Sequence, residues 1–167
     1  MPGCVIRALD PAAREEVALV AERMRLTLVE VLGDEAGGAM YTSEWLEDRV
    51  LEHLDPARLH GQVFVAVEPD GRLAGHTIVR IERDEAGHAF GLFSTTYVAP
   101  ESRRAGVADA LIERGEAWMR EQQVTASQTW TADSNGPLLS LFRKHGYALT
   151  LRVPEKKMVV LSKAFVG

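Results

Sequence analysis

The segment YVAPESRRAGVA, residues 97–108, decides the fold because it joins a predicted strand to a predicted helix. The first N–H groups of a helix have no partner within it, and the helix dipole adds partial positive charge at that end. Small or short side chains let a phosphate approach such a helix start, and the segment has a run of them at Ala105, Gly106, Val107 and Ala108. The segment therefore suits a pyrophosphate.

Two arginines in the same segment favour this interpretation. Arg103 and Arg104 precede the glycine, and guanidinium groups bind phosphate oxygens in a paired geometry. Taken alone, the same residues also fit an ordinary surface loop that carries two arginines and a glycine. The loop by itself leaves both alternatives open.

The sequence around this segment predicts a strand, a helix and a second strand in succession. Residues 89–98 are apolar, aromatic and β-branched, which is typical of a strand. After the loop, apolar residues recur at helical spacing, at Ala108, Leu111, Ile112, Gly115, Trp118 and Met119. Beyond this helix we expect a strand at 126–131, a helix from Pro137 to the C-terminal Gly146, and a hairpin formed by 147–153 and 158–161.

The N-terminal part predicts two helices and a hairpin. A short apolar run at 5–9 is followed by Asp10 and Pro11, which are typical of an N-cap and a first helical residue. The first helix has its apolar face at Val17, Val20, Met24, Leu28 and Val31, and ends at the glycines Gly33, Gly37 and Gly38. Ser43 is expected to cap the second helix, whose stripe is Leu46, Val50 and Leu54. Residues 63–68 and 73–82 form the hairpin, around the turn Pro69-Asp70-Gly71.

Composition restricts the class of protein. A chain of 167 residues with 46% hydrophobic content fits one domain over residues 1–167, with a mixed α/β sheet covered by helices. A net charge of -5 argues against a nucleic-acid partner. The single cysteine, Cys4, excludes an internal disulfide, and no stretch has the length of a membrane span. We expect a cytoplasmic protein without a metal site.

Two motifs give the sequence a family resemblance. The P-loop and dinucleotide glycine motifs are absent. Residues 103–108 instead resemble the Q/R-x-x-G-x-G/A acyl-CoA signature of the GNAT acetyltransferase superfamily, and residues 98–102 match its strand-to-loop pattern. Asn135 followed by LFRKHGY at 141–147 is similar to that family's asparagine and L-Y-x-K-x-G-F. The two motifs have the order and spacing of the family.

The resemblance implies a fold, a cosubstrate and a reaction. The fold is a mixed, mostly antiparallel sheet of about six or seven strands flanked by about four helices. Acetyl-CoA is the cosubstrate, and the acceptor is an amine of a small molecule, an amino-acid derivative or a peptide. A homodimer is plausible for this architecture. The resemblance assigns cofactor contacts to the loop residues and to Tyr97, Val98, Asn135 and Phe142. It implies that the strand of Val98 separates from its neighbour, so that the backbone groups of Tyr97 and Val98 bind the pantetheine amides.

The expected chemistry leaves the general base and the general acid open. Val98 N–H is the expected donor to the developing oxyanion. By strand alternation Leu92, Ser94, Thr96 and Val98 share one face, so Ser94 and Thr96 are expected to border the acceptor and order a water. No glutamate lies on this strand. The alternative bases are Glu82, His76, His88 and Asp133, although each also has an ordinary structural role.

The second motif departs from the family at one residue. Phe142 stands where the family often has the tyrosine that protonates the leaving thiolate, and a phenyl ring has no proton to donate. Tyr147 matches the family's core aromatic, and Asn135 fits either a helix cap or a cofactor contact. The missing tyrosine and glutamate leave a second hypothesis, a regulatory module that binds acyl-CoA with little or no turnover. Trp45 and Tyr41 are candidates to line the acceptor pocket.

Overall fold

The computed structural model describes residues 3–32, 42–103 and 105–165, with backbone only for 28–32. In this part of the chain seven strands form one sheet in the order β1-β2-β3-β4-β5-β7-β6. The strands are β1 (Val5–Ala8), β2 (Gly61–Val67), β3 (Leu73–Arg83), β4 (Ala89–Val98), β5 (Ala126–Ala132), β6 (Ala148–Val153) and β7 (Met158–Ala164). The described α-helices are α1 (Arg14–Leu32), α3 (Ser43–Leu54), α4 (Val107–Glu121) and α5 (Gly136–Lys144), with short 3-10 turns η1 (Pro100–Ser102) and η2 (Pro154–Lys156).

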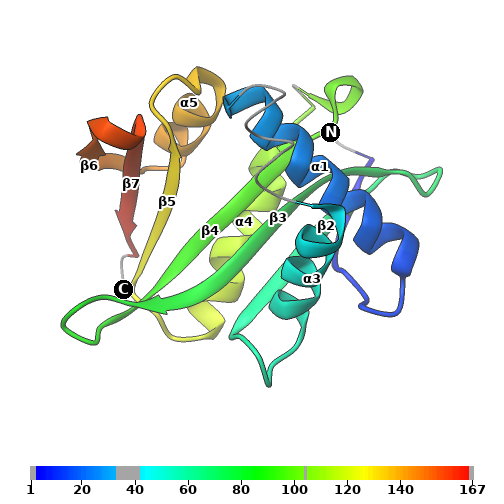
Figure 1. The fold of residues 1–167 in the computed structure, drawn as a ribbon, viewed down its shortest axis with the longest axis horizontal. Helices are drawn as coiled ribbons and strands as arrows, with labels where there is room; N and C mark the ends of the chain where they lie inside the picture. Colours follow the sequence, from blue (N-terminus) through cyan, green and yellow to red (C-terminus); the bar gives the residue numbers. More distant parts are fainter. Residues whose placement is uncertain (1–2, 33–41, 104, 166–167) are drawn as a thin grey trace.

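The sheet is mixed and mostly antiparallel, which confirms the predicted fold class. Strands β1 to β4 pair in sequence order and antiparallel. Strand β5 then lies parallel to β4 after the crossover through α4, and β7 lies between β5 and β6 (Figure 1). The C-terminal hairpin therefore extends the sheet with its second strand innermost.

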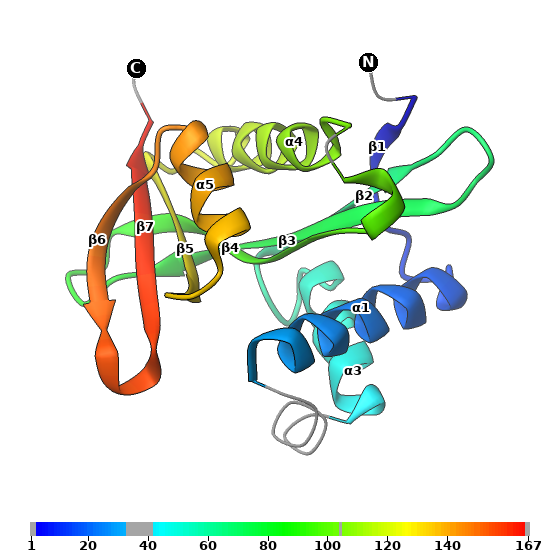
Figure 2. The same cartoon turned by 90° about the horizontal axis from the view of Figure 1, so that it is seen from above.

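Helices cover both faces of the sheet. Helices α1 and α3 lie on one face, and α4 and α5 lie on the other (Figure 2). Beneath α1 and α3, a cluster that includes Val20, Val50 and Ile78 is buried. Beneath α4 and α5, a larger cluster includes Phe93 and Leu111. The apolar periodicity of the four helices is thus satisfied by burial against one sheet.

Two predicted helix caps are wrong by one or a few residues. Helix α1 begins at Arg14 instead of Pro11, because the Asp10 carboxylate accepts the Ala12 N–H at 2.9 Å and forms a turn before the helix. Helix α3 is capped by Thr42, whose Oγ1 accepts the Trp45 N–H at 3.1 Å, and Ser43 is the first helical residue. The predicted stop at Gly33, Gly37 and Gly38 lies outside the described residues.

Strand β4 pairs fully with β3 but only briefly with β5. Its register with β3 runs from Ala89 to Val98, whereas its register with β5 covers three pairs, from Gly91 opposite Ser127 to Phe93 opposite Thr129. Beyond Phe93 the two strands are no longer paired, although both continue. The sheet is therefore open along half of β4.

None of the described helices is long and apolar enough to cross a bilayer.

Gly115 gives a test of how closely α4 packs on β4. A Cβ atom at Gly115 would lie 2.5 Å from Cε1 of the buried Phe93 ring. We expect Gly115→Ala to lower the free energy of unfolding by about 1–3 kcal/mol, because the helix must move away from the strand. Gly136→Ala is the matched control, since nothing lies within 4 Å of the added atom, and it should be neutral or slightly stabilising. Urea unfolding of both variants checks this; equal effects would contradict the packing.

Candidate active site

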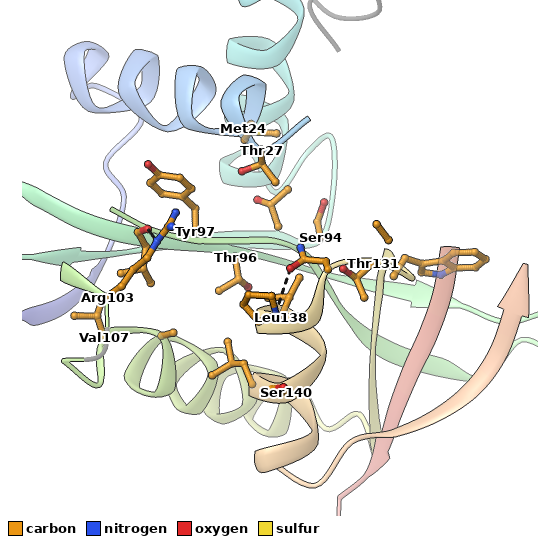
Figure 3. A pocket seen from close by; sticks show the side chains of 18 of the residues that line it. Met24, Thr27, Ser94, Thr96, Tyr97, Arg103, Val107, Thr131, Leu138 and Ser140 are labelled. Carbon is orange, nitrogen blue, oxygen red and sulfur yellow. Dashed lines mark hydrogen bonds between the residues drawn. The ribbon is translucent and has the colours of Figure 1, made fainter. Parts of the chain in front are cut away.

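A cleft of about 940 Å³ opens where β4 and β5 separate. Residues 94–98 of β4 line it from the middle of the sheet, and residues 130–132 of β5 line the facing strand. The start of α4 and helix α5 border it on one side, and α1 and α3 border it on the other (Figure 3). One cleft therefore reaches both faces of the sheet.

A β-bulge at Ser94 changes which side chains share a face. Ile78 of β3 lies opposite Thr95 and Val79 lies opposite Phe93, so Ser94 is the extra residue. The bulge makes the expected alternation of Leu92, Ser94, Thr96 and Val98 wrong from Thr96 onward.

Side-chain contacts show which face of the sheet each residue around the bulge occupies. Ser94 Oγ accepts from Arg80 Nη1 at 3.4 Å, and the same Arg80 nitrogen lies 3.4 Å from His53 of α3. Thr96 Oγ1 instead shares a hydrogen bond of 2.8 Å with Thr77, and Val98 packs against the cluster beneath α4. Ser94 therefore faces α1 and α3, whereas Thr96 and Val98 face α4 and α5.

The main chain of β4 presents alternate peptide groups to the cleft. The Ala99 N–H donates to the Ala74 carbonyl at 2.8 Å, so Ala99 faces β3. A Cβ atom on Gly75 of β3 would lie 2.4 Å from the Tyr97 carbonyl oxygen, so that carbonyl also faces β3. Along an extended strand the N–H and C=O of one residue point to the same side, and those of the next residue point to the other side. The N–H and C=O groups of Thr96 and Val98 therefore point to the open edge. The expectation that Tyr97 supplies backbone groups is wrong; its side chain lines the cleft instead.

Helix α4 starts at the cleft with free donors. Gly106 is the N-cap residue, has a left-handed φ of 81°, and makes no side-chain cap, which leaves the first N–H groups of the helix without an intrahelical partner. A residue other than glycine is strained in this conformation. Gly106, Val107 and Ala108, which the sequence analysis assigns to cofactor contacts, line the cleft, and Ala105 is an exposed turn residue. Arg104 lies outside the described residues.

Arg103 lines the cleft but already has partners. Its Nε donates to the Val98 carbonyl at 2.9 Å, and its guanidinium lies 5.9 Å from the centre of the Tyr97 ring (Figure 3). Arg23 of α1 lies over the same ring at 5.2 Å. In this arrangement Arg103 holds the loop against the end of β4 while its charge stays at the cleft.

The second motif contributes one residue to the cleft and one to the core. Asn135 lines the cleft, and its side chain also accepts the Leu138 N–H at 3.3 Å as the cap of α5, so both predicted roles are compatible with its position. Phe142 is fully buried, with its ring 5.4 Å from Phe93 and 5.0 Å from Tyr147. The expected cofactor contact of Phe142 is therefore wrong, because α5 turns this ring toward the core.

Sequence reasoning missed the polar pair that α5 and α4 bring to the cleft. Lys144 and Asp109 line it and form an ion pair of 2.9 Å, and His145 Nε2 lies 2.8 Å from the same carboxylate oxygen. Hydrogen bonding to Lys144 lowers the pKa of Asp109, which stays ionised and engaged. Ser140 lies one turn before Lys144 and also lines the cleft. The i, i+4 spacing of Ser140 and Lys144 was the available sequence signal.

The half of the cleft beneath α1 and α3 is mostly apolar. Met24 and Thr27 come from α1, and Trp45, Leu46 and Arg49 come from α3. Trp45, one of the two candidates for the acceptor pocket, lines this half, whereas Tyr41 lies outside the described residues. This half has the position expected of an acceptor site, across β4 from the start of α4.

The sequence profile of the acetyltransferase (GNAT) family matches residues 31–147. This chain belongs to the GNAT acetyltransferase family. It is 28% identical over 144 residues to the mycothiol acetyltransferase of Arthrobacter sp. (strain FB24), an alignment that covers 85% of this chain. The match spans 42% of the length of that curated relative.

Solved GNAT structures share the fold. The PaiA N-acetyltransferase of Thermoplasma acidophilum, in complex with coenzyme A, superposes with a TM-score of 0.77 at 17% identity, covering 97% of this chain and 99% of that chain. A chain of the NatC complex bound to Gag peptide and CoA gives a TM-score of 0.74 at 15% identity, covering 99% of this chain and 100% of that one. At this identity the likeness concerns the fold alone.

None of the four candidate bases lines the cleft of this GNAT chain in the part that the structure describes. Glu82 accepts a hydrogen bond of 2.5 Å from Arg80, and His88 is an exposed turn residue beside Asp84. Asp133 is exposed and does not cap α5, since Asn135 does. His76 is fully buried behind the cleft, with Nε2 3.3 Å from Thr95 Oγ1.

Burial also makes His53 and His76 unsuitable for acid–base catalysis near neutral pH. Burial, assisted by the charge of Arg23, lowers the pKa of His76 to about 3. Burial likewise lowers the pKa of His53 to about 4, and its Nδ1 lies 2.8 Å from the Arg49 carbonyl. His76 Nδ1 has no hydrogen-bond partner among the described residues. Both rings therefore stay neutral in the folded protein at neutral pH.

The depressed pKa of His76 predicts a pH dependence of stability. The folded pKa, about 3, lies below the ordinary value of 6.5, so the unfolded chain binds more protons below that pH. We expect the free energy of unfolding to fall as pH is lowered from about 7 to about 4, and to fall less steeply in His76→Gln. His88→Gln is the control, because the His88 side chain is 82% exposed, and its slope should match the unmodified protein. Denaturant unfolding at several pH values measures the slopes; an unchanged slope in His76→Gln would refute this explanation.

Proposed function

We propose that this chain transfers an acetyl group from acetyl-CoA to an amine of a small molecule, an amino-acid derivative or a peptide. The observation that carries the proposal is that an uncapped helix start and an unpaired strand edge border one cleft. Acetyl-CoA needs both, since its pyrophosphate is an anion and its pantetheine arm carries amides. The proposal treats residues 1–167 as one domain, as the sequence analysis expects.

The start of α4 suits the pyrophosphate. Its N–H groups and dipole offer positive potential, and Gly106 and Ala108 leave the main chain accessible from the cleft. Lys144, which lines the same half and is mostly exposed, adds a cation to it. Arg103 contributes charge from the other end of the loop.

The open edge of β4 suits the pantetheine arm. The peptide groups of Thr96 and Val98 point to this edge, so an extended amide chain can bind there as an added strand would. The Val98 carbonyl also accepts from Arg103, which leaves its N–H for the ligand. The thioester then lies near the bulge, where β4 and β5 converge.

The reaction joins an amine nitrogen to the acetyl carbon of the thioester. The C–S bond breaks, coenzyme A leaves as a thiolate, and the amine proton passes to solvent. Negative charge develops on the carbonyl oxygen, and a backbone N–H of Thr96 or Val98 at the open edge is positioned to donate a hydrogen bond to that oxygen. A thiol of pKa about 8.5 leaves without prior protonation more readily than an alcohol, so Phe142 is compatible with turnover.

Removal of the amine proton is assigned to water ordered by hydroxyl groups. An alkyl ammonium with a pKa of about 10.4 must lose a proton before it attacks. Ser94 and Thr95 line the cleft with hydroxyl groups, held by Arg80 and His76 respectively. Among the described lining residues the one carboxylate is Asp109, and it is paired with Lys144. Ser94 and Thr95 are therefore the better candidates to order a water.

A regulatory module that binds acetyl-CoA without turnover is less well supported. The cleft continues beyond β4 into the half beneath α1 and α3, which a module that only binds acetyl-CoA does not need. The curated relative, 42% of whose length matches this chain, is also an acetyltransferase by name. Turnover with a second substrate therefore accounts for more of the cleft.

Gly106 provides the test of the proposal. Acetyl-CoA at about a hundredfold over its Kd should stabilise the fold by about 2.7 kcal/mol, which corresponds to a rise in Tm of roughly 5–10 °C. Gly106→Glu should abolish the rise, because it strains the left-handed residue and places a carboxylate at the anion site. Thermal unfolding with and without acetyl-CoA measures this.

Gly87→Glu is the matched control for that experiment. Gly87 has a similar φ of 86°, and nothing lies within 4 Å of an added Cβ, so backbone strain and charge are comparable away from the cleft. This variant should keep the full rise in Tm. No rise in the unmodified protein would reject the acetyl-CoA site, and a rise without release of coenzyme A on any amine would favour the regulatory module.

A further inference from the structure

Two exposed tryptophans lie in the same cleft. Six large apolar side chains are exposed among the described residues. The two of greatest size are Trp45, which is 48% exposed, and Trp130, which is 41% exposed. Both line the cleft, whereas the other four, Val5, Leu19, Leu26 and Leu151, do not. Exposed apolar surface that gathers in one concave place marks a binding site more often than scattered exposure does.

Strand alternation places Trp130 in the half of the cleft beneath α1 and α3, the half that the proposed function assigns to the acceptor. The hydroxyl of Ser127 accepts from the Tyr147 hydroxyl at 2.8 Å, in the core beneath α4. Trp130 is three residues later on β5 and therefore points to the opposite face, the face that α1 and α3 cover. Met158 lies opposite Ala132, which is two residues after Trp130, and so shares that face. Trp130 and Met158 thus form the wall on the β5 side.

Helices α1 and α3 provide the other wall of this half. Trp45 and Leu46 come from α3, and Met24 comes from α1. Ser94 and Thr95 of β4 form the floor between the walls, and they are the residues assigned to order water. An amine that reaches this floor must therefore have its body between apolar and aromatic side chains.

The charges of this half disfavour a polycation. Among the described residues Arg49 lines it, forms an ion pair with Glu52 and lies 5.8 Å from the Trp45 ring. Arg103 lines the cleft at the edge of this half, 5.9 Å from the Tyr97 ring. The carboxylate of Asp109 lies on α4, across β4, and is paired with Lys144. A polyamine would thus bring several charges to a wall that carries a cation.

We propose that the acceptor is a primary amine carried on an aromatic or other apolar body, with an arylalkylamine as the simplest example. This inference rests on the proposed function. Aromatic pairs add about 0.5–1.5 kcal/mol beyond area burial, which is roughly threefold to tenfold in kcat/KM for each tryptophan that contacts the substrate.

The test compares amines and variants by release of coenzyme A from acetyl-CoA. The amines are phenethylamine, spermidine and the compact ethanolamine, and the variants are Trp130→Ala, Trp45→Ala and Leu151→Ala. Phenethylamine should exceed both other amines by at least about tenfold in kcat/KM. In each tryptophan variant kcat/KM should fall roughly threefold to tenfold with phenethylamine and less than about twofold with ethanolamine, while the KM for acetyl-CoA stays unchanged. Leu151→Ala removes an equally exposed apolar side chain outside the cleft and should leave kcat/KM unchanged with both amines.

Three results would overturn the inference. They are a preference for spermidine, an equal loss on all amines in the tryptophan variants, and release of coenzyme A with none of the three amines. Thermal unfolding with acetyl-CoA separates these results from failure of the proposed function. If acetyl-CoA raises the Tm in the same preparation, the cofactor groove stands and only the acceptor class is rejected; without that rise, the acetyl-CoA site itself is rejected.

Discussion

The short pairing between β4 and β5 is the constraint on which the rest of the structure depends. Two strands that run together for three residue pairs and then separate leave peptide groups at an interior sheet edge. Unpaired peptide groups are costly to bury without a partner, so this edge is maintained only where solvent or a ligand satisfies it. The helix that crosses from β4 to β5 starts at the open end of the same gap, which adds the donors of its first turn. Both binding features of the cleft therefore follow from one separation of strands.

The bulge at Ser94 lets side chains of one strand face both halves of the cleft, which the proposed reaction assigns to two different substrates. Before the bulge Phe93 packs into the core under α4, and after it Thr96 and Val98 again face that side. Ser94 and Thr95, at the bulge itself, both face the half covered by α1 and α3. The cofactor side and the acceptor side of β4 thus meet at a single kink. Glu116, which is buried in α4, accepts from the Tyr147 hydroxyl at 2.8 Å and from Lys163 of β7 at 3.0 Å, and so connects α4 with the C-terminal part of the sheet.

Local sequence signals determined which elements could be predicted. The turn around Gly71 and the glycine Gly146 at the end of α5 each follow from the chemistry of one residue, and the structure has both where the sequence predicts them, whereas Asn135 caps α5 in one of the two roles that the sequence left open. The bulge was missed because Ser94 has no local signature such as glycine or proline. It arises from register against β3, which is a tertiary property. The burial of Phe142 and the outward face of Trp130 were likewise set by packing between elements distant in sequence.

Amide hydrogen exchange along β4 tests the central claim most directly. We expect the Thr96 and Val98 amides, which point to the open edge, to exchange rapidly in the free protein and to become protected when coenzyme A is added. The Tyr97 amide between them points to β3 and should be protected in both states. Protection of Thr96 and Val98 in the free protein, or no change on addition of saturating coenzyme A, would contradict the account.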